Sequence, residues 1–205
     1  MRLYYLVLFL LLISCSPLTK KGLLKNEEFL VDNSGKHILC ADPSFLNWYY
    51  FTVFDDSNNI IRNEHLFRRN DTLYFSNKTE VFSPDFNKYI AENNFTAAKQ
   101  VNKIDRLAIE SSVKILAPII AKHEMLGDSI LSFESVFSVR SNQKTLINDT
   151  FHYNYLYLIP VQNKLVDITA FKQGDKTFLF VRHTWSVEEK YDSYTKYKDY
   201  IVALP

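Results

Sequence analysis

The segment Leu131-Ser-Phe-Glu-Ser-Val-Phe-Ser-Val-Arg140 alternates apolar and polar residues along most of its length. Side chains of a β-strand point in turn to its two faces. One face would carry mainly apolar side chains and the other mainly polar ones, as in a half-buried antiparallel strand. The segment therefore predicts a strand over 131–140.

The same period of two continues toward the C-terminus. Residues 153–159, 165–171 and 177–185 read as three further strands, with Gln162-Asn163 and Gln173-Gly174-Asp175 as the short links between them. Short links between alternating segments predict antiparallel hairpins. Beyond them, Ser186-Val-Glu-Glu189 matches a helix capping box. We expect a short helix there and a last strand near 197–204.

The N-terminal part is rich in β-forming residues. Trp48-Tyr-Tyr-Phe-Thr-Val-Phe54 is the densest run, and the cluster Asp55-Asp-Ser-Asn-Asn59 after it is typical of a turn. Candidate strands of this part are 37–41, 47–54, 60–67, 72–76 and 79–82.

Between these two β regions the period changes. Ser83-Pro84-Asp85 has the features of a helix start: a capping hydroxyl, a proline at the first helical position and an acid in the first turn. From about Thr96 an apolar stripe at helical spacing predicts a longer helix, kinked by Pro118 and ended by Gly127; its members are Ala97, Val101, Ile104, Ala108, Ser111, Ile115 and Ile119. We therefore expect an α+β fold, an antiparallel sheet with a helical insert at 84–126 packed on one face.

The chain opens with Met1-Arg2 and an apolar run of eleven residues, Leu3–Ile13. A membrane-spanning helix needs about 20 apolar residues, so the run has the length of a signal-peptide core. The run ends in Leu12-Ile13-Ser14-Cys15, which resembles the lipobox of bacterial lipoproteins.

This resemblance covers about the first fifteen residues. It implies cleavage before Cys15 and a diacylglyceryl thioether on that cysteine. Residues 1–14 would then be the signal peptide, 15–35 a lipidated tether and 36–205 a single α+β domain. Since Ser16 and not aspartate follows the cysteine, sorting in such lipoproteins predicts an envelope protein of the outer membrane. An ordinary secretory signal, or a hydrophobic start to a cytoplasmic protein, is the alternative.

Charge argues against nucleic acid as a partner. The chain has 24 basic and 23 acidic residues, and loss of Arg2 with the signal peptide would leave 23 of each. A neutral chain lacks the excess positive charge that binding to phosphates needs. The membrane, reached through the lipid, and an envelope protein or glycan are the partners we expect.

The chemistry-bearing residues form no recognisable catalytic set. There are two cysteines and five histidines, and none shows the spacing of a metal site or a nucleophile motif. If Cys15 is lipidated, Cys40 has no partner for a disulfide, and we expect a buried, inert thiol. His37, three residues away on a strand, would point to the opposite face. We therefore expect no catalytic residue, metal or cofactor, while a site gathered by folding stays open.

Two weaker patterns concern surface recognition. Asp71-Thr72-Leu73 and Asp128-Ser129-Ile130 resemble a three-residue O-glycosylation pattern of some Gram-negative envelope proteins, with Thr72 and Ser129 as acceptors, although so short a pattern also occurs by chance. Four tyrosines recur at every third position from 191 to 200. They fit a stacking surface for glycans or peptides, or packing against the sheet.

Three functions remain open on this basis. The first is a non-enzymatic accessory or binding module of the envelope. The second is an envelope hydrolase with a dispersed site. The third is a carrier of lipid or another small molecule in an apolar pocket.

Overall fold

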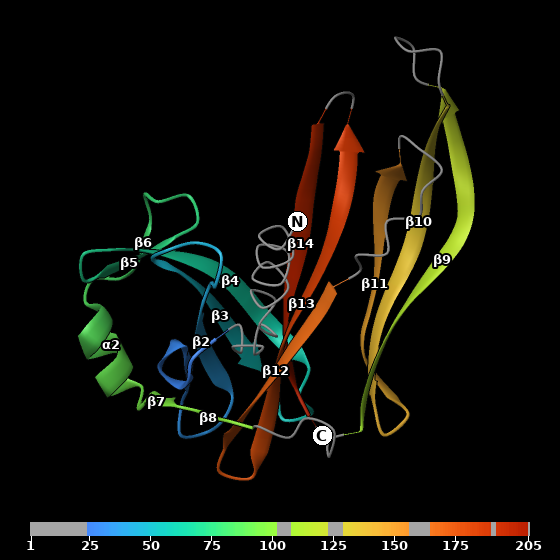
Figure 1. Cartoon of the computed structure of the whole chain (residues 1–205). Coiled ribbons are helices and arrows are strands. Elements are labelled where there is room, and N and C mark those ends of the chain that lie inside the picture. The colour runs from blue at the N-terminus through green and yellow to red at the C-terminus, as the bar shows by residue number, and fades with distance from the viewer. Residues whose placement is uncertain (1–23, 102–107, 123–128, 156–164, 190–191, 205) are drawn as a thin grey trace, which may run out of the picture.

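The computed structural model describes residues 24–101, 108–122, 129–155, 165–189 and 192–204. Strands make up 64% of the structure and helix only 8%. The strands form three antiparallel sheets, which we name A, B and C (Figure 1). The expected α+β class is therefore wrong, because the protein is mostly β.

Sheet A has seven strands in the order β6-β5-β4-β3-β2-β1-β7. Its strands are β1 (Phe29–Val31), β2 (His37–Ala41), β3 (Trp48–Phe54), β4 (Ile60–Arg69), β5 (Thr72–Phe75), β6 (Val81–Ser83) and β7 (Thr96–Ala97). A 3-10 turn, η1 (Asn26–Glu28), precedes β1, and helix α2 (Phe86–Glu92) follows β6. Strand β1 lies inside residues 15–35, the range expected to be the tether, and both Phe29 and Val31 are fully buried.

Sheets B and C take up the rest of the chain. Sheet B has the order β14-β13-β12-β8, with β8 (Lys99–Gln100), β12 (Leu165–Gln173), β13 (Lys176–Glu189) and β14 (Asp192–Ala203). Sheet C has the order β11-β10-β9, with β9 (Ile109–Lys122), β10 (Ser129–Ser141) and β11 (Lys144–Tyr155).

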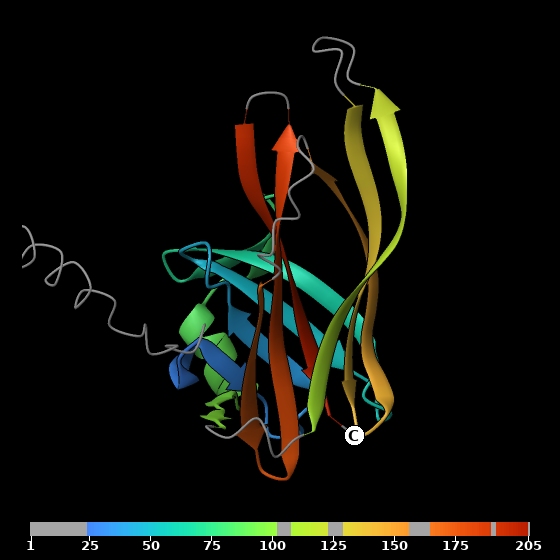
Figure 2. The same ribbon diagram turned by 45° about the vertical axis from the view of Figure 1, so that its right-hand side comes forward.

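The molecule is built in layers, with α2, sheet A, sheet B and sheet C in succession (Figures 1 and 2). Sheet B is central: Phe178 and Phe180 pack against sheet A, while Leu179 and Val181 pack toward sheet C. This explains why the four consecutive residues are all buried. The far face of sheet A is covered by α2, whose Phe86 joins Phe51 and Leu66 in a third core.

The expected helical insert at 84–126 is wrong apart from one short helix. Helix α2 begins at Phe86 and is capped by Asp85, whose side chain accepts a hydrogen bond from the backbone N–H of Lys88 at 2.9 Å. Ser83, the expected cap, instead ends β6.

Residues 109–122 of the expected long helix instead form strand β9 on the edge of sheet C. Residues 109, 113 and 115 are β-branched and also alternate with period two, so the pairing with β10 overrides the helical spacing. Pro118 fits this edge strand because its missing N–H is tolerated at edges and bulges. The register with β10 shifts beside it, between Phe133 and Ser135.

The helix expected at Ser186-Val-Glu-Glu189 is also wrong. These residues extend β13, and they pair with β14 as far as Glu189 and Asp192. A capping-box pattern cannot form a helix when its backbone groups already pair in a sheet. The predicted strands at 37–41, 47–54 and 60–67 agree with β2, β3 and β4 within two residues. Part of the strand expected at 153–159, and the link at Gln162-Asn163, lie outside the described residues.

Candidate functional site

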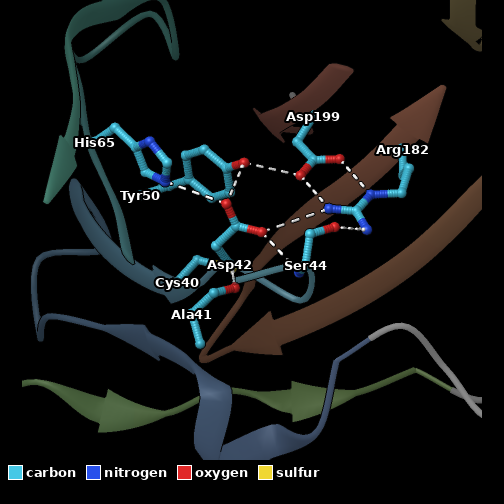
Figure 3. A network of polar contacts seen from close by, with 8 residues as sticks. All are labelled: Cys40, Ala41, Asp42, Ser44, Tyr50, His65, Arg182 and Asp199. Carbon is cyan, nitrogen blue, oxygen red and sulfur yellow. Dashed lines mark hydrogen bonds and ion pairs between the residues drawn. The ribbon is translucent and has the colours of Figure 1, made fainter. Parts of the chain in front are cut away.

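A network of buried polar side chains joins sheets A and B at one end of their common core. Asp42 follows β2, Tyr50 lies on β3 and His65 on β4, whereas Arg182 and Asp199 lie on β13 and β14 (Figure 3). On the faces where sheets A and B meet, each strand carries apolar side chains at alternate positions. The polar residues of the network occupy the next positions of the same faces, where the apolar side chains end.

Arg182 is the central cation of the network. Its Nε lies 2.7 Å from Oδ1 of Asp199 and its Nη2 lies 2.5 Å from Oδ2, which is a bidentate ion pair between register partners. Nη2 also lies 3.6 Å from Oδ1 of Asp42, and Nη1 donates to the hydroxyl of Ser44 at 2.6 Å. The ring of Tyr197 covers the guanidinium, with its centroid 4.3 Å from the central carbon.

Asp42 is the acceptor shared by both sheets. Its side chain is only 1% exposed. Oδ2 accepts from the hydroxyl of Tyr50 at 3.0 Å and lies 3.1 Å from Nε2 of His65, and Oδ1 accepts from the backbone N–H of Ser44 at 2.8 Å. Burial would raise the pKa of Asp42, but the hydrogen bonds from His65, Ser44 and Tyr50 outweigh it and hold this pKa below its usual value.

Tyr50 lies between the two carboxylates. Its hydroxyl is within 3.0 Å of Asp42 and 2.9 Å of Asp199. Burial and these two negative charges raise the pKa of Tyr50, so its proton stays in place. The His65 ring stacks on the Tyr50 ring at 4.8 Å between centroids, and its other neighbour is Trp48 at 4.5 Å.

The network fixes the loop between β2 and β3. Within the loop, the side chain of Asp42 accepts a hydrogen bond from the backbone N–H of Ser44. Arg182 of sheet B donates a second hydrogen bond to the hydroxyl of Ser44. The backbone N–H of Asp42 donates to the carbonyl of Trp48 at 2.8 Å, which closes the loop. At its tip, Phe45 is 53% exposed and Leu46 is 89% exposed.

The arrangement is suited to fixing the loop between β2 and β3, and it is not suited to proton transfer. Both carboxylates are almost fully buried, and the oxygens of each already accept hydrogen bonds from the protein. A general acid or base must reach a substrate proton at hydrogen-bond distance. Tyr50, with its raised pKa, is likewise a poor nucleophile.

Sequence reasoning missed this network, although a signal for it exists. Phe178, Phe180 and Arg182 share a strand face, as do Ile201 and Asp199 on the neighbouring strand. An apolar row that ends in paired opposite charges predicts an ion pair across two strands. Its partner across the core, Asp42, cannot be identified without the packing of the sheets.

Cys40 is completely buried in the core between sheets A and B, as predicted, and burial raises the pKa of its thiol well above the usual value. His37 lies three positions away and stacks toward Phe51 on the other face of sheet A. Its Nδ1 lies 2.9 Å from Asp32.

The other histidines are dispersed. His65 belongs to the network, and His183 is buried between sheets B and C. His152 pairs with Glu134 through the backbone of β11, and His123 lies outside the described residues. Within the described ranges, no three His, Cys, Asp or Glu side chains are grouped closely enough to hold a metal ion.

The residues named for surface recognition and anchoring lie apart from the network. Thr72 begins β5 and donates its hydroxyl to the carbonyl of Pro84 at 3.1 Å, and Ser129 begins β10. Tyr194, Tyr197 and Tyr200 of the tyrosine series lie on β14, and Tyr191 lies outside the described residues. Tyr197 and Tyr200 lie on opposite faces of the strand, one over Arg182 and the other against Phe137. Cys15 lies outside the described residues.

In the part of the chain that the structure describes, no helix is long and apolar enough to cross a membrane. Comparison with known proteins gives no relative. No family model matches the chain, and neither a curated protein nor a solved structure matches it significantly.

Proposed function

We propose that the chain is a non-enzymatic binding module of the bacterial cell envelope. Its lipid would be attached at Cys15 and hold it to the outer membrane, and the loop between β2 and β3 would contact another envelope protein. The anchor rests on the lipobox resemblance of Leu12-Ile13-Ser14-Cys15 and on Ser16.

The observation that carries the proposal is the exposed apolar pair Phe45-Leu46 on a loop fixed by both sheets. Exposed apolar side chains cost solubility, and where they cluster they mark interaction sites. A loop already held in one conformation loses little entropy on binding. Aromatic side chains such as that of Phe45 are enriched in protein interfaces.

Binding is favoured over hydrolysis by the state of the network. Its carboxylates and guanidinium use their hydrogen bonds to connect sheet A to sheet B and to position Ser44. These contacts hold the loop between β2 and β3 in place. The same contacts occupy the carboxylates and the guanidinium, which are then not available to a substrate.

The test is site-specific photocrosslinking in cells of the organism that makes the chain. A photoreactive residue replaces Leu46, and a matched control replaces Ile61, which is also exposed, at 66%, but lies at the start of β4. We expect a discrete crosslinked protein at position 46 and none at 61. The captured protein, once identified and purified, should bind the chain directly.

The variant Phe45→Ser with Leu46→Ser should then weaken that binding at least tenfold, because apolar anchors at an interface centre are each worth roughly 2 kcal/mol or more. The corresponding variant Ile60→Ser with Ile61→Ser should leave it unchanged. Equal crosslinking at both positions, or equal binding by both variants, would contradict the proposal.

A further inference from the structure

The face of sheet A that packs on sheet B is only partly covered. Among the described residues, the core between the two sheets includes Tyr50 and Phe54 of β3 but no residue of β4, β5 or β6. Strands β5 and β6 lie to one side of sheet B (Figure 1). The side chains that β4, β5 and β6 carry on this face are therefore candidates for contact with another molecule.

Four large side chains form a row across the uncovered part of this face. They lie on four neighbouring strands, and each is the register partner of the next: Trp48, Phe67, Tyr74 and Val81. Register partners point to the same face of a sheet. This face is the one that meets sheet B, since Trp48 lies two positions before Tyr50 on β3. We call these four residues the aromatic row.

The aromatic row is accessible from outside. Val81 is 49% exposed, and Trp48, Phe67 and Tyr74 are half-buried. The rings of Trp48 and Phe67 lie 5.2 Å apart between centroids, with an angle of 48° between them. Side chains that bind a membrane must reach into the lipid, whereas half-buried rings in a sheet offer contacts only at the sheet surface. The row therefore suits a ligand that lies flat on the sheet.

The charges beside the aromatic row are positive. Nζ of Lys78, in the turn between β5 and β6, lies 5.2 Å from the centroid of the Trp48 ring and 5.1 Å from that of Phe67. Arg69 lies two positions after Phe67 on β4 and so falls on the same face. Asp71, the acid nearest to Arg69 in the sequence, pairs instead with Arg68.

No ion pair joins Lys78 or Arg69 to an acidic side chain in the part of the chain that the structure describes. Both cations are exposed. A ligand with acidic groups would therefore gain two ion pairs here without breaking any in the protein.

The spacing of the aromatic row matches that of a polysaccharide. Neighbouring strands of a sheet are about 4.8 Å apart, which is close to the length of one pyranose ring in an extended polysaccharide. A chain that crosses the strands would place successive sugar rings over successive side chains of the row. The C–H groups on one face of a pyranose are weakly positive, and the face of an aromatic ring is negative, so the two stack.

We propose that the aromatic row binds an acidic polysaccharide. Its sugar rings would stack on the three aromatic members of the row, and its carboxylates would pair with Lys78 and Arg69. A nucleic acid, with a charge on every phosphate, would call for more cations than these two. The proposal goes beyond the contact of the loop between β2 and β3 with an envelope protein, and it does not depend on that contact.

Calorimetric titration with two sugar hexamers provides the test. One is the β-1,4-linked hexamer of glucuronic acid. The other is cellohexaose, its neutral counterpart, which has hydroxymethyl groups in place of the carboxylates. The full chain is kept in a polyoxyethylene detergent, which contains no sugar. We expect the acidic hexamer to bind at least about fivefold more tightly, because only its carboxylates can pair with Lys78 and Arg69.

Two variants test the residues. Lys78→Glu should lower the affinity for the acidic hexamer at least about fivefold, because a repulsion replaces an attraction. Its matched control is Lys172→Glu, which makes the same change of charge at an exposed position of β12 and should leave the affinity unchanged. Tyr74→Ala should lower the affinity for both hexamers about threefold to tenfold, through lost stacking. Melting temperatures establish that each variant is folded, and the exposed position of Lys78 makes its substitution safe for the fold.

Four results would overturn the proposal. The first is that the chain binds neither hexamer, and the second is that it binds both equally. The third is an equal loss of affinity in Lys172→Glu and Lys78→Glu, which would show a general effect of charge. The fourth is equally tight binding, dependent on Lys78, of dihexanoyl phosphatidylglycerol or of oligothymidylate in the same titration. It would assign the face to an anionic lipid or to a nucleic acid instead.

Discussion

Replacement of Arg182 by methionine tests whether the polar network holds sheets A and B together. Methionine keeps much of the apolar length of the arginine and removes its charge. The side chains of Asp42 and Asp199, which are only 1% and 2% exposed, would then lack a cation. Asp42 would keep its contacts with Tyr50, His65 and the backbone N–H of Ser44, and Asp199 would keep the hydrogen bond from Tyr50.

The expected loss is large because the charges left behind are buried. Removal of one partner from a buried ion pair typically costs about 3–5 kcal/mol, most of it from the uncompensated charge. We expect Arg182→Met to lower the free energy of unfolding by this amount at pH 7. Adding Asp199→Leu to it should recover most of the loss, because one of the two orphaned carboxylates is then gone.

The pH dependence gives an independent check with a defined sign. In the intact protein the pKa of Asp42 is below its unfolded value, so its contribution to stability is present above pH ~4 and is lost as the pH falls through the folded pKa. Without Arg182 the buried carboxylate of Asp42 should take up a proton more readily than in the unfolded chain. The difference between the two proteins should therefore shrink on acidification from pH 7 toward pH ~4.

Urea denaturation followed by circular dichroism measures both effects, with the slope against urea as a check that the same surface is exposed. The exposed ion pair of Lys88 and Glu92 on α2 supplies a control, since Lys88→Met should cost less than about 1 kcal/mol. A loss below about 1 kcal/mol for Arg182→Met, or a loss independent of pH, would show that the network does not stabilise the contact between the sheets.

Three further outcomes are expected. Cys15→Ala should abolish labelling of the chain by radioactive fatty acid, and labelling that persists would contradict the lipobox assignment. Cys40→Ser should lower the free energy of unfolding by about 1–3 kcal/mol, because it buries a more polar group, and the native thiol should resist alkylation until the chain unfolds. Gly35→Ala should cost more than Gly174→Ala in the same urea titration: both glycines have positive φ, +65° and +57°, but only at Gly35 would the new Cβ meet Lys176, 2.6 Å from its Cδ.

The strands could be predicted from the sequence wherever the apolar residues follow a period of two and no helical spacing competes with it. His37–Ala41 forms β2 at the expected bounds, and the alternation around Phe137 marks β10. The prediction failed at Ile109–Lys122, where residues 111, 115 and 119 satisfy a helical spacing while the β-branched residues satisfy a period of two. Pairing with β10 decides between these, and tertiary pairing is not encoded in a local window.

The candidate site was harder to foresee for a related reason. Asp42 and Asp199 are both hydrogen-bonded to Tyr50, although 157 positions separate them in the sequence. Each residue alone resembles an ordinary polar residue at the end of a strand. Their role follows only from the stacking of sheet A on sheet B, which sets two strand ends side by side.

The order of the sheets along the chain has a consequence for biogenesis. All strands of sheet A come from residues 29–97, whereas three of the four strands of sheet B come from residues 165–203. During synthesis or export from the N-terminus, sheet A can therefore form while its inner face, with Ile38 and Phe54, still awaits Phe178 and Phe180. Until the last forty or so residues emerge, the apolar inner face of sheet A stays uncovered, and transiently exposed apolar surface of this kind makes a folding chain prone to aggregation.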